Sequence, residues 1–420
     1  MKTTISFVCF SAMLLTASTL FAQNRNLDNY RQPDKNGINV FESPKDSTST
    51  FDGVKVRIGG ASTLQFQAVD HENSGSVALK EIGYNFNLAT ANLDLDVALA
   101  DGVRMHLRTY LSSRHHPEPY VKGGYFQIDR LEFIKEGFLE DLMKYTTLKI
   151  GHMENNYGDA HFRRSDNAQT LHNPFVGNLI MDAFTTEVGA ELYYRRSGFI
   201  GMVGFTNGKL NQDVANPDSG GASFLAKLGY DKQLDDDLRI RITGSVYNTG
   251  KVANSYLYAA DRSGSRYYLV MENVDATTSA NFRSGRYNPA LRNQISAFMF
   301  NPFVKYKGLE FFGTIETATG KASTELEKRT ANQFAGELVY RFGKDENFYF
   351  GGRYNKVGSE EATGEEIDIT RLQLGAGWFL TKNVLAKIEY VNQEYDGYGT
   401  TSIFNEGKFK GLMLEAAIGF

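Results

Sequence analysis

From Val54 onward, apolar and polar residues alternate along most of the chain. In 92–99, for example, Leu93, Leu95 and Val97 are apolar and are separated by Asp94 and Asp96. Successive side chains of a β-strand point to opposite faces, so this period of two predicts strands with one apolar and one polar face. A soluble sandwich would show the same alternation, so strand length and connections must decide between the two folds.

The alternating segments are long, about 9 to 15 residues, whereas globular strands usually have about 5–6. A tilted membrane-spanning strand needs about 9–11 residues. The pattern predicts sixteen strands, at 54–68, 86–99, 103–113, 121–134, 145–153, 185–196, 198–206, 222–231, 237–248, 295–306, 308–317, 331–342, 347–357, 368–380, 383–395 and 409–420. Tyr267–Met271 is a candidate for one further strand.

The connections between these segments alternate between short and long. The short ones include 100–102, 343–346 and 381–382, and the long ones include 70–85, 154–184, 207–221, 249–294, 318–330 and 396–408. Outer-membrane barrels have short periplasmic turns and longer external loops. The expected fold is therefore all-β: a transmembrane antiparallel β-barrel of about sixteen strands, with short periplasmic turns and long external loops.

Composition changes this picture little. A length of 420 residues would suggest two or three soluble domains, and the mean hydropathy of −0.37 resembles that of a soluble protein. Barrel strands average to a polar composition, so the hydropathy is compatible with a barrel. No apolar run of about 18 residues follows the first twenty-odd positions, which excludes a polytopic helical membrane protein. A net charge of −4 gives no sign of a nucleic-acid partner.

The N-terminus reads as a targeting segment. Lys2 precedes an apolar stretch that ends at Ala22, which predicts a Sec-type signal peptide over 1–22. The polar segment 23–52, with Pro33 and Pro44, is expected to be a flexible periplasmic leader, and 53–420 the barrel. The single cysteine, Cys9, falls within the signal peptide.

Two segments carry a resemblance to a known family. Leu148 to Gly158, with the letters LKIGHMENNYG, resembles the strand-and-loop motif of the phosphate-selective porin O and P family, and Glu187 to Leu192 is similar to porin-like proteins of that kind. The C-terminal strand, which ends at Phe420, resembles the signal strand that the barrel-assembly machinery reads. The resemblance implies a porin in the outer membrane of a Gram-negative cell, possible homotrimers, and the lipid bilayer and the assembly machinery as partners.

The polar positions of the alternating segments supply candidates for the channel lining. They are Lys55, Arg57, Asp94, Asp96, Arg104, His106, Arg108, Lys149, Glu187, Glu191, Arg239, Arg241, Glu337, Arg341 and Arg371. A sixteen-stranded barrel is expected to enclose an aqueous channel rather than a packed interior. Two interpretations of the charges stay open: that they pair across neighbouring strands, or that they form a charged constriction.

The loop 154–184 is a candidate constriction loop, with an external lid as the alternative. Its candidate residues are Phe162, Arg163, Arg164, His172 and Asn173. No catalytic motif, cofactor motif or metal-ligand spacing stands out; His152, His161 and His172 match no such spacing. The sequence therefore predicts a non-enzymatic porin for small hydrophilic solutes, with some preference for anions. The alternatives are a specific phosphate or polyphosphate porin, a barrel enzyme, and a plugged structural or adhesive barrel.

Overall fold

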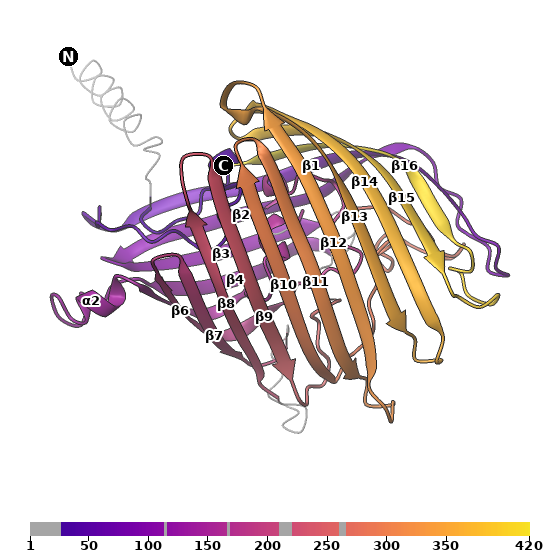
Figure 1. Cartoon of the computed structure of the whole chain (residues 1–420), viewed down its shortest axis with the longest axis horizontal. Helices are drawn as coiled ribbons and strands as arrows, with labels where there is room; N and C mark the ends of the chain where they lie inside the picture. The colour runs from indigo at the N-terminus through magenta and orange to yellow at the C-terminus, as the bar shows by residue number, and fades with distance from the viewer. Residues whose placement is uncertain (1–26, 113–115, 166–168, 210–220, 260–265) are drawn as a thin grey trace, which may run out of the picture.

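The computed structural model describes residues 27–112, 116–165, 169–209, 221–259 and 266–420. Sixteen strands of these residues form one closed antiparallel barrel, as the sequence predicts (Figure 1). The strands are β1 (Lys55–Glu72), β2 (Asn85–Ala100), β3 (Val103–Ser112), β4 (His116–Ile128), β5 (Thr146–Glu154), β6 (Thr186–Arg196), β7 (Phe199–Thr206), β8 (Ser223–Gln233), β9 (Leu238–Thr249), β10 (Gln294–Tyr306), β11 (Leu309–Lys321), β12 (Arg329–Phe342), β13 (Phe348–Glu360), β14 (Glu366–Thr381), β15 (Val384–Asp396) and β16 (Lys408–Gly419). The predicted signal peptide lies outside the described residues.

The barrel closes where its first and last strands meet. β1 pairs with β16 from Ala61 opposite Gly419 to Glu72 opposite Lys408. The terminal residue extends the ladder, because Gly60 and Phe420 exchange two backbone hydrogen bonds of 3.0 Å. Closure leaves the sheet without an edge, so every strand has a partner on both sides.

The connections sort to the two ends of the barrel. One end, called the short-turn end below, carries the turns between β2 and β3, β6 and β7, β10 and β11, and the other even–odd strand pairs; the opposite end carries the long loops. The β4–β5 connection at 129–145 departs from this pattern, because it contains the short helix α2 (Glu140–Met143). The strand predicted at 121–134 therefore ends early. Ile128 is opposite Val103, the first residue of β3, and the last backbone bond on that side runs from the Asp129 N–H to the Gly102 carbonyl at 2.7 Å, within the β2–β3 turn.

The outer surface of the barrel is apolar. Leu64, Leu93 and Leu414 are all more than 40 % exposed, while their sequence neighbours point inward. Phe342, Phe348 and Trp378 stack on one another near the short-turn end, with ring centroids 5.7 and 5.9 Å apart. Aromatic belts of this kind sit at membrane interfaces. No helix among the described residues has the length and apolar character needed to cross a membrane.

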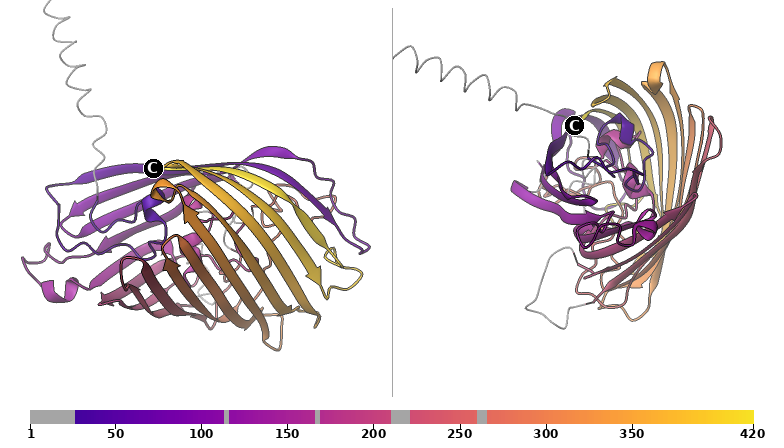
Figure 2. Two further views of the ribbon diagram at one scale, coloured as in Figure 1. Left: turned by 45° about the horizontal axis from the view of Figure 1, so that its top comes forward. Right: turned by 90° about the vertical axis from the view of Figure 1, so that its left-hand side faces the viewer.

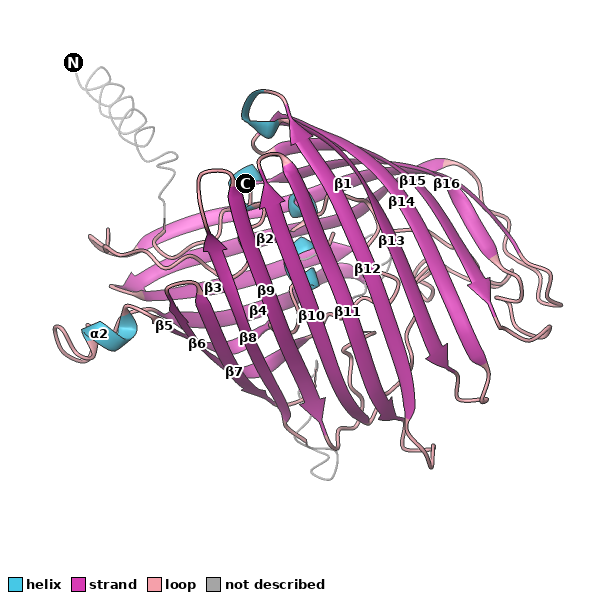
Figure 3. Ribbon diagram, in the orientation of Figure 1, coloured by secondary structure: helices cyan, strands magenta, loops and turns pink. Residues whose placement is uncertain are grey.

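The interior differs from the aqueous channel that the strand number predicts. Much of the leader and of the described loop segments 155–165, 169–185, 250–259 and 266–293 lies within the ring of strands, as the end-on view in Figure 2 shows. Short helical turns, η2 (Lys35–Gly37), η3 (Ala160–Arg163) and η4 (Thr170–His172), mark these segments inside the barrel in Figure 3; η6 (Lys344–Glu346) belongs to the β12–β13 turn. Tyr267–Met271, the candidate extra strand, belongs to the inner loop and forms no strand.

Candidate functional site in the barrel lumen

The structure places the residues predicted to line the channel on the inner face of the barrel, buried or half-buried. They are Lys55, Arg57, Asp94, Asp96, Arg104, His106, Arg108, Lys149, Glu187, Glu191, Arg239, Arg241, Glu337, Arg341 and Arg371. Most of them contact protein rather than open water. Glu337, for example, pairs with Arg163 of the loop at 3.1 Å and with Arg353 of β13 at 2.7 Å.

The charges on β2 and β3 pair across the two strands. Asp94 is opposite Arg108, which donates to both of its carboxylate oxygens at 2.7 Å. Asp96 is opposite His106 and lies 2.8 Å from its Nδ1, and Arg104 is 3.4 Å away. Of the two interpretations that the sequence left open, cross-strand pairing is the arrangement seen in this part of the wall.

A buried group of charges joins the leader, the loop 155–185 and the wall. Arg241 of β9 donates to both oxygens of Glu42 (2.8 and 2.9 Å) and to both oxygens of Asp159 (2.8 and 2.9 Å). Lys227 of β8 lies 2.9 Å from Asp159 and 3.7 Å from Glu42. We call these four residues the Asp159 cluster. Burial alone would raise the pKa of Asp159, but Arg241 and Lys227 hold it well below its usual value.

The loop 155–185 is anchored on the opposite wall through its backbone. Glu389 of β15 accepts hydrogen bonds from the N–H groups of Val176 (2.8 Å) and Gly177 (3.2 Å). Asn355 of β13 accepts from the N–H of Ile180 at 2.7 Å. The candidate constriction residues Phe162, Arg163, Arg164, His172 and Asn173 all lie inside the barrel with this loop. The segment therefore crosses the lumen instead of forming a lid outside it.

The loop 250–293 also folds inward. The Tyr267 hydroxyl donates to Glu389 at 2.7 Å, the Tyr258 hydroxyl donates to Glu316 at 2.8 Å, and Arg266 pairs with Glu415. Together with 155–185 it contributes to an apolar cluster against the inner wall, in which Ile180 and Val270 are fully buried. Burying such side chains stabilises by roughly 1.5–3 kcal/mol each, so these loops are held by a core as well as by polar contacts.

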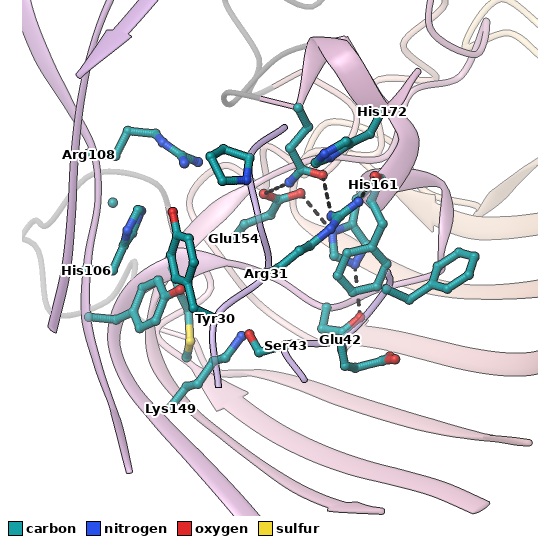
Figure 4. A pocket seen from close by; sticks show the side chains of 18 of the residues that line it. Tyr30, Arg31, Glu42, Ser43, His106, Arg108, Lys149, Glu154, His161 and His172 are labelled. Atoms are coloured by element: carbon teal, nitrogen blue, oxygen red, sulfur yellow. Dashed lines mark hydrogen bonds and ion pairs between the residues drawn. The ribbon is translucent and has the colours of Figure 1, made fainter. Parts of the chain in front are cut away.

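A cavity of about 160 Å³ lies between the leader, the loop 155–185 and strands β3 to β6 (Figure 4). The leader contributes Tyr30, Arg31 and Glu42 to its lining, and the wall contributes Lys149 and Glu154. Tyr30 covers the guanidinium groups of two wall arginines, Arg57 and Arg104, at 4.9 and 5.2 Å from its ring centroid.

Two cations of this cavity, Lys149 and Arg31, make their ring contacts and hydrogen bonds with neutral groups among the described residues. The Lys149 ammonium lies over the rings of Tyr125 (5.5 Å) and Tyr193 (5.3 Å), and no described carboxylate oxygen is within 4.0 Å of it. Arg31 donates to the Gly37 and Phe162 carbonyls and to Gln169 at 2.9–3.1 Å. Glu42 and Glu154 also line the cavity and interact electrostatically with Arg31, so its charge is partly balanced, whereas Lys149 has no ion-pair partner among the described residues.

His172 is a neutral member of the same cavity. It is 3 % exposed, and its Nε2–H donates to the Asp34 carbonyl at 3.1 Å. Burial, followed by the nearby Arg31, lowers its pKa well below the ordinary value. Its Nδ1 is then an acceptor without a protein partner in the described structure. No group of three or more potential metal-ligating side chains occurs among the described residues.

Sequence reasoning missed three members of the Asp159 cluster: Lys227, Asp159 and Glu42. Lys227 lies at an inward-facing position of the predicted strand 222–231, so the alternation alone would have identified it as a lining residue. Asp159 and Glu42 lie in aperiodic segments. Nothing local marks them, because their role depends on where the loop and the leader enter the barrel.

No protein-family model matches the chain, and no curated protein matches it in sequence. Solved structures match in fold. The anion-selective porin of Comamonas acidovorans matches with a TM-score of 0.55 and 12% identity, over 87% of this chain and all (100%) of that one. The outer-membrane channel DcaP of Acinetobacter baumannii gives 0.53 and 10%, over 89% and 99%. The trimer form of OmpT, an outer-membrane protein of Vibrio cholerae, gives 0.53 and 11%, over 88% and 100%. At these identities the similarity establishes the barrel fold.

Proposed function

We propose that the protein is an outer-membrane channel through which small hydrophilic solutes diffuse, and that it performs no catalysis. The observation that supports this best is the closed barrel with an apolar exterior and a charged interior. A closed barrel is one of the two structures that satisfy their backbone hydrogen bonds within a bilayer. Its charged interior would then provide the polar path across the membrane.

The proposal includes a route to the outer membrane. A Sec signal peptide at 1–22 would direct export, and the last strand with its terminal Phe420 would be read by the barrel-assembly machinery. Assembly as homotrimers is part of the same proposal, and it is supported by the trimeric structure among the similar folds. Cross-linking in the native membrane would test the trimer.

We further propose a preference for anions. It is supported by Lys149 and Arg31, two cations in this cavity whose ring contacts and hydrogen bonds in the described structure are with neutral groups. Arginine and lysine bind carboxylate and phosphate groups through charge-assisted hydrogen bonds. A phosphate-specific porin is the narrower alternative, and it predicts that phosphate blocks the chloride current.

A plugged structural barrel is a second candidate, and the filled lumen favours it. The leader and two loops occupy the interior, and Arg241 and Asp159 within it are fully buried. This candidate predicts no current at all from correctly folded protein.

Planar-bilayer recording of the refolded full chain tests the proposal. Steady or gated conductance is expected, with a reversal potential in a KCl gradient that indicates anion preference. Lys149→Gln should shift the reversal potential toward cations. Lys410→Gln, the same change at an exposed lysine on the outer face, should leave it unchanged. Absence of any current from folded protein would contradict the channel function.

A further inference from the structure

Most of the N-terminal leader, 27–45, lies inside the barrel although its composition predicts a flexible extension. We propose that this segment is a removable plug: it closes the short-turn end of the lumen, and solutes pass when it leaves. The inference rests on the proposed channel function and adds the element that controls it.

The leader spans the opening from one wall to the other. At one side, Lys45 pairs with Asp129 at 3.1 Å, next to the end of β4. In the middle, Glu42 reaches Arg241 of β9. At the far side, the Lys35 N–H donates to the carbonyl of Lys382, in the β14–β15 turn, at 2.8 Å. Contacts beside the end of β4, with β9 and with the β14–β15 turn mean that the segment crosses the opening.

Further contacts hold the leader between these points. Asn39 donates to Glu310 of β11 at 2.7 Å, and Asp34 pairs with Lys382 at 3.1 Å. The Phe41 ring packs edge-on against Phe303 of β10 and Phe162 of the loop, with centroids 5.5 and 5.9 Å apart. The leader is thus a docked element with specific partners.

The leader can leave without opening the barrel. It contains no strand, and the bond from Lys35 to Lys382 is the one backbone–backbone hydrogen bond that joins it to the wall in the described part of the chain. The barrel closes through β1 and β16 alone. Between this segment and the barrel, residues 46–50 are exposed and contain no helix or strand, so they can serve as the connection when the leader leaves.

Undocking also changes the charge of the lumen. The Asp159 cluster contains two carboxylates and two cations while Glu42 is in place. When the leader leaves, Arg241 keeps Asp159 and Asp231, the latter at 3.0 Å and shared with Arg239, while Lys227 keeps Asp159, so this part of the wall loses one negative charge. Glu42 therefore occupies a place that an anionic group of a solute could take in the open channel.

The test compares three forms of the mature chain in planar bilayers: unmodified, lacking 27–50, and carrying Lys35→Cys with Lys382→Cys. The chain has no cysteine after Cys9, so a cleavable bis-maleimide reagent can join only the introduced pair. Deletion should raise the mean conductance several-fold. Cross-linking should abolish openings, and reduction of the linker should restore them. Each single-cysteine variant, treated in the same way, is the matched control.

The outcomes separate the plug from the channel. Equal conductance in all three forms would overturn the plug while leaving the channel in place, because current would then bypass the leader. No current from any form, each shown to be folded by circular dichroism and heat-dependent gel mobility, would overturn the channel and the plug together. If the deletion variant does not fold, the cross-linked full chain decides alone, since reduction must restore its openings.

Discussion

The contact between Glu42 and Arg241 offers a sharp test of how firmly the leader is docked. Replacing Glu42 by Gln keeps the size and shape of the side chain and removes its charge. Arg241 then keeps its two bonds to Asp159, at 2.8 and 2.9 Å, but loses a bidentate carboxylate partner on the leader. Docking should weaken, while the barrel itself should remain intact.

The structure sets the size of the effect. Breaking a buried ion pair by removing one partner costs about 3–5 kcal/mol, which is an upper limit here because Asp159 still neutralises Arg241. Hydrogen bonds to charged groups contribute about 1.5–3 kcal/mol each, and the Gln amide oxygen can still accept one. A loss of about 2–3 kcal/mol follows, and it raises the undocked population about 30- to 150-fold, at tenfold per 1.4 kcal/mol.

Limited trypsin digestion of the folded protein measures that population. Cleavage after Arg31 or Lys35 requires the leader to leave the barrel, because both side chains and the backbone of Lys35 are bound there. When opening and closing are fast relative to cleavage, the rate is proportional to the open population. Mass spectrometry of the released fragments identifies the two sites.

The matched control is Glu72→Gln, which breaks an ion pair with Lys408 at the long-loop end, where Glu72 is 66% exposed. Exposed pairs contribute about 0–1 kcal/mol, and this one does not touch the leader, so the control should digest like the unmodified protein. Equal digestion rates for Glu42→Gln and the unmodified protein would refute the argument that the Asp159 cluster holds the leader.

Three further expectations follow from other contacts. Burial alone would raise the pKa of Glu42, but Arg241 and Lys227 hold it at about 2, below its ordinary 4.5. The contribution of Glu42 to docking is therefore fully present above about pH 4.5 and is lost as the pH falls toward 2. Cleavage of the leader by pepsin should accelerate from pH 4 to pH 2 in the unmodified protein, and much less in Glu42→Gln. Trp378, the only tryptophan, is 50 % exposed on the outer face; its fluorescence should be quenched by brominated lipids, and unchanged emission would argue against a lipid-facing belt there. Glu389→Gln removes the charged acceptor of the Val176 and Gly177 N–H groups, which lie 2.8 and 3.2 Å from it. Such a bond contributes about 1.5–3 kcal/mol, so hydrogen exchange of these two amides should accelerate about tenfold or more. Exchange in the leader should stay the same.

The barrel was predictable because its signal is local and repeated. Alternation along β2, from Leu93 to Leu99, already specifies which side chains face lipid, and the same rule holds in strand after strand. Strand β4 shows the limit. Leu131, Phe133 and Ile134 continue the apolar composition past Ile128, but β3 offers no backbone beyond Val103. A strand ends where its neighbour ends, and that information lies elsewhere in the chain.

The filling of the lumen was not predictable in the same way. The sequence marks Arg241 as an inward charge, but its partners Glu42 and Asp159 lie 199 and 82 residues away along the chain, in aperiodic segments. Polar composition made the leader look flexible, since its few apolar residues show no period. Those polar groups are complementary to charges on the wall, and only the three-dimensional arrangement reveals the match.

The obstructions inside the barrel differ in what holds them, and this difference indicates where solutes would pass. The loops 155–185 and 250–293 share an apolar cluster with the wall, in which Ile180, Val270 and Met413 are fully buried, so moving them would expose apolar surface to water. The leader is held by charges and hydrogen bonds, which water and ions can replace when it undocks, and by a smaller apolar contact of Phe41 with Phe303 and Phe312. The cavity next to Lys149 lies between the leader and β3 to β6, on the side of the lumen that the leader covers. Displacing the leader therefore opens the polar, positively charged side of the barrel and leaves the apolar cluster intact.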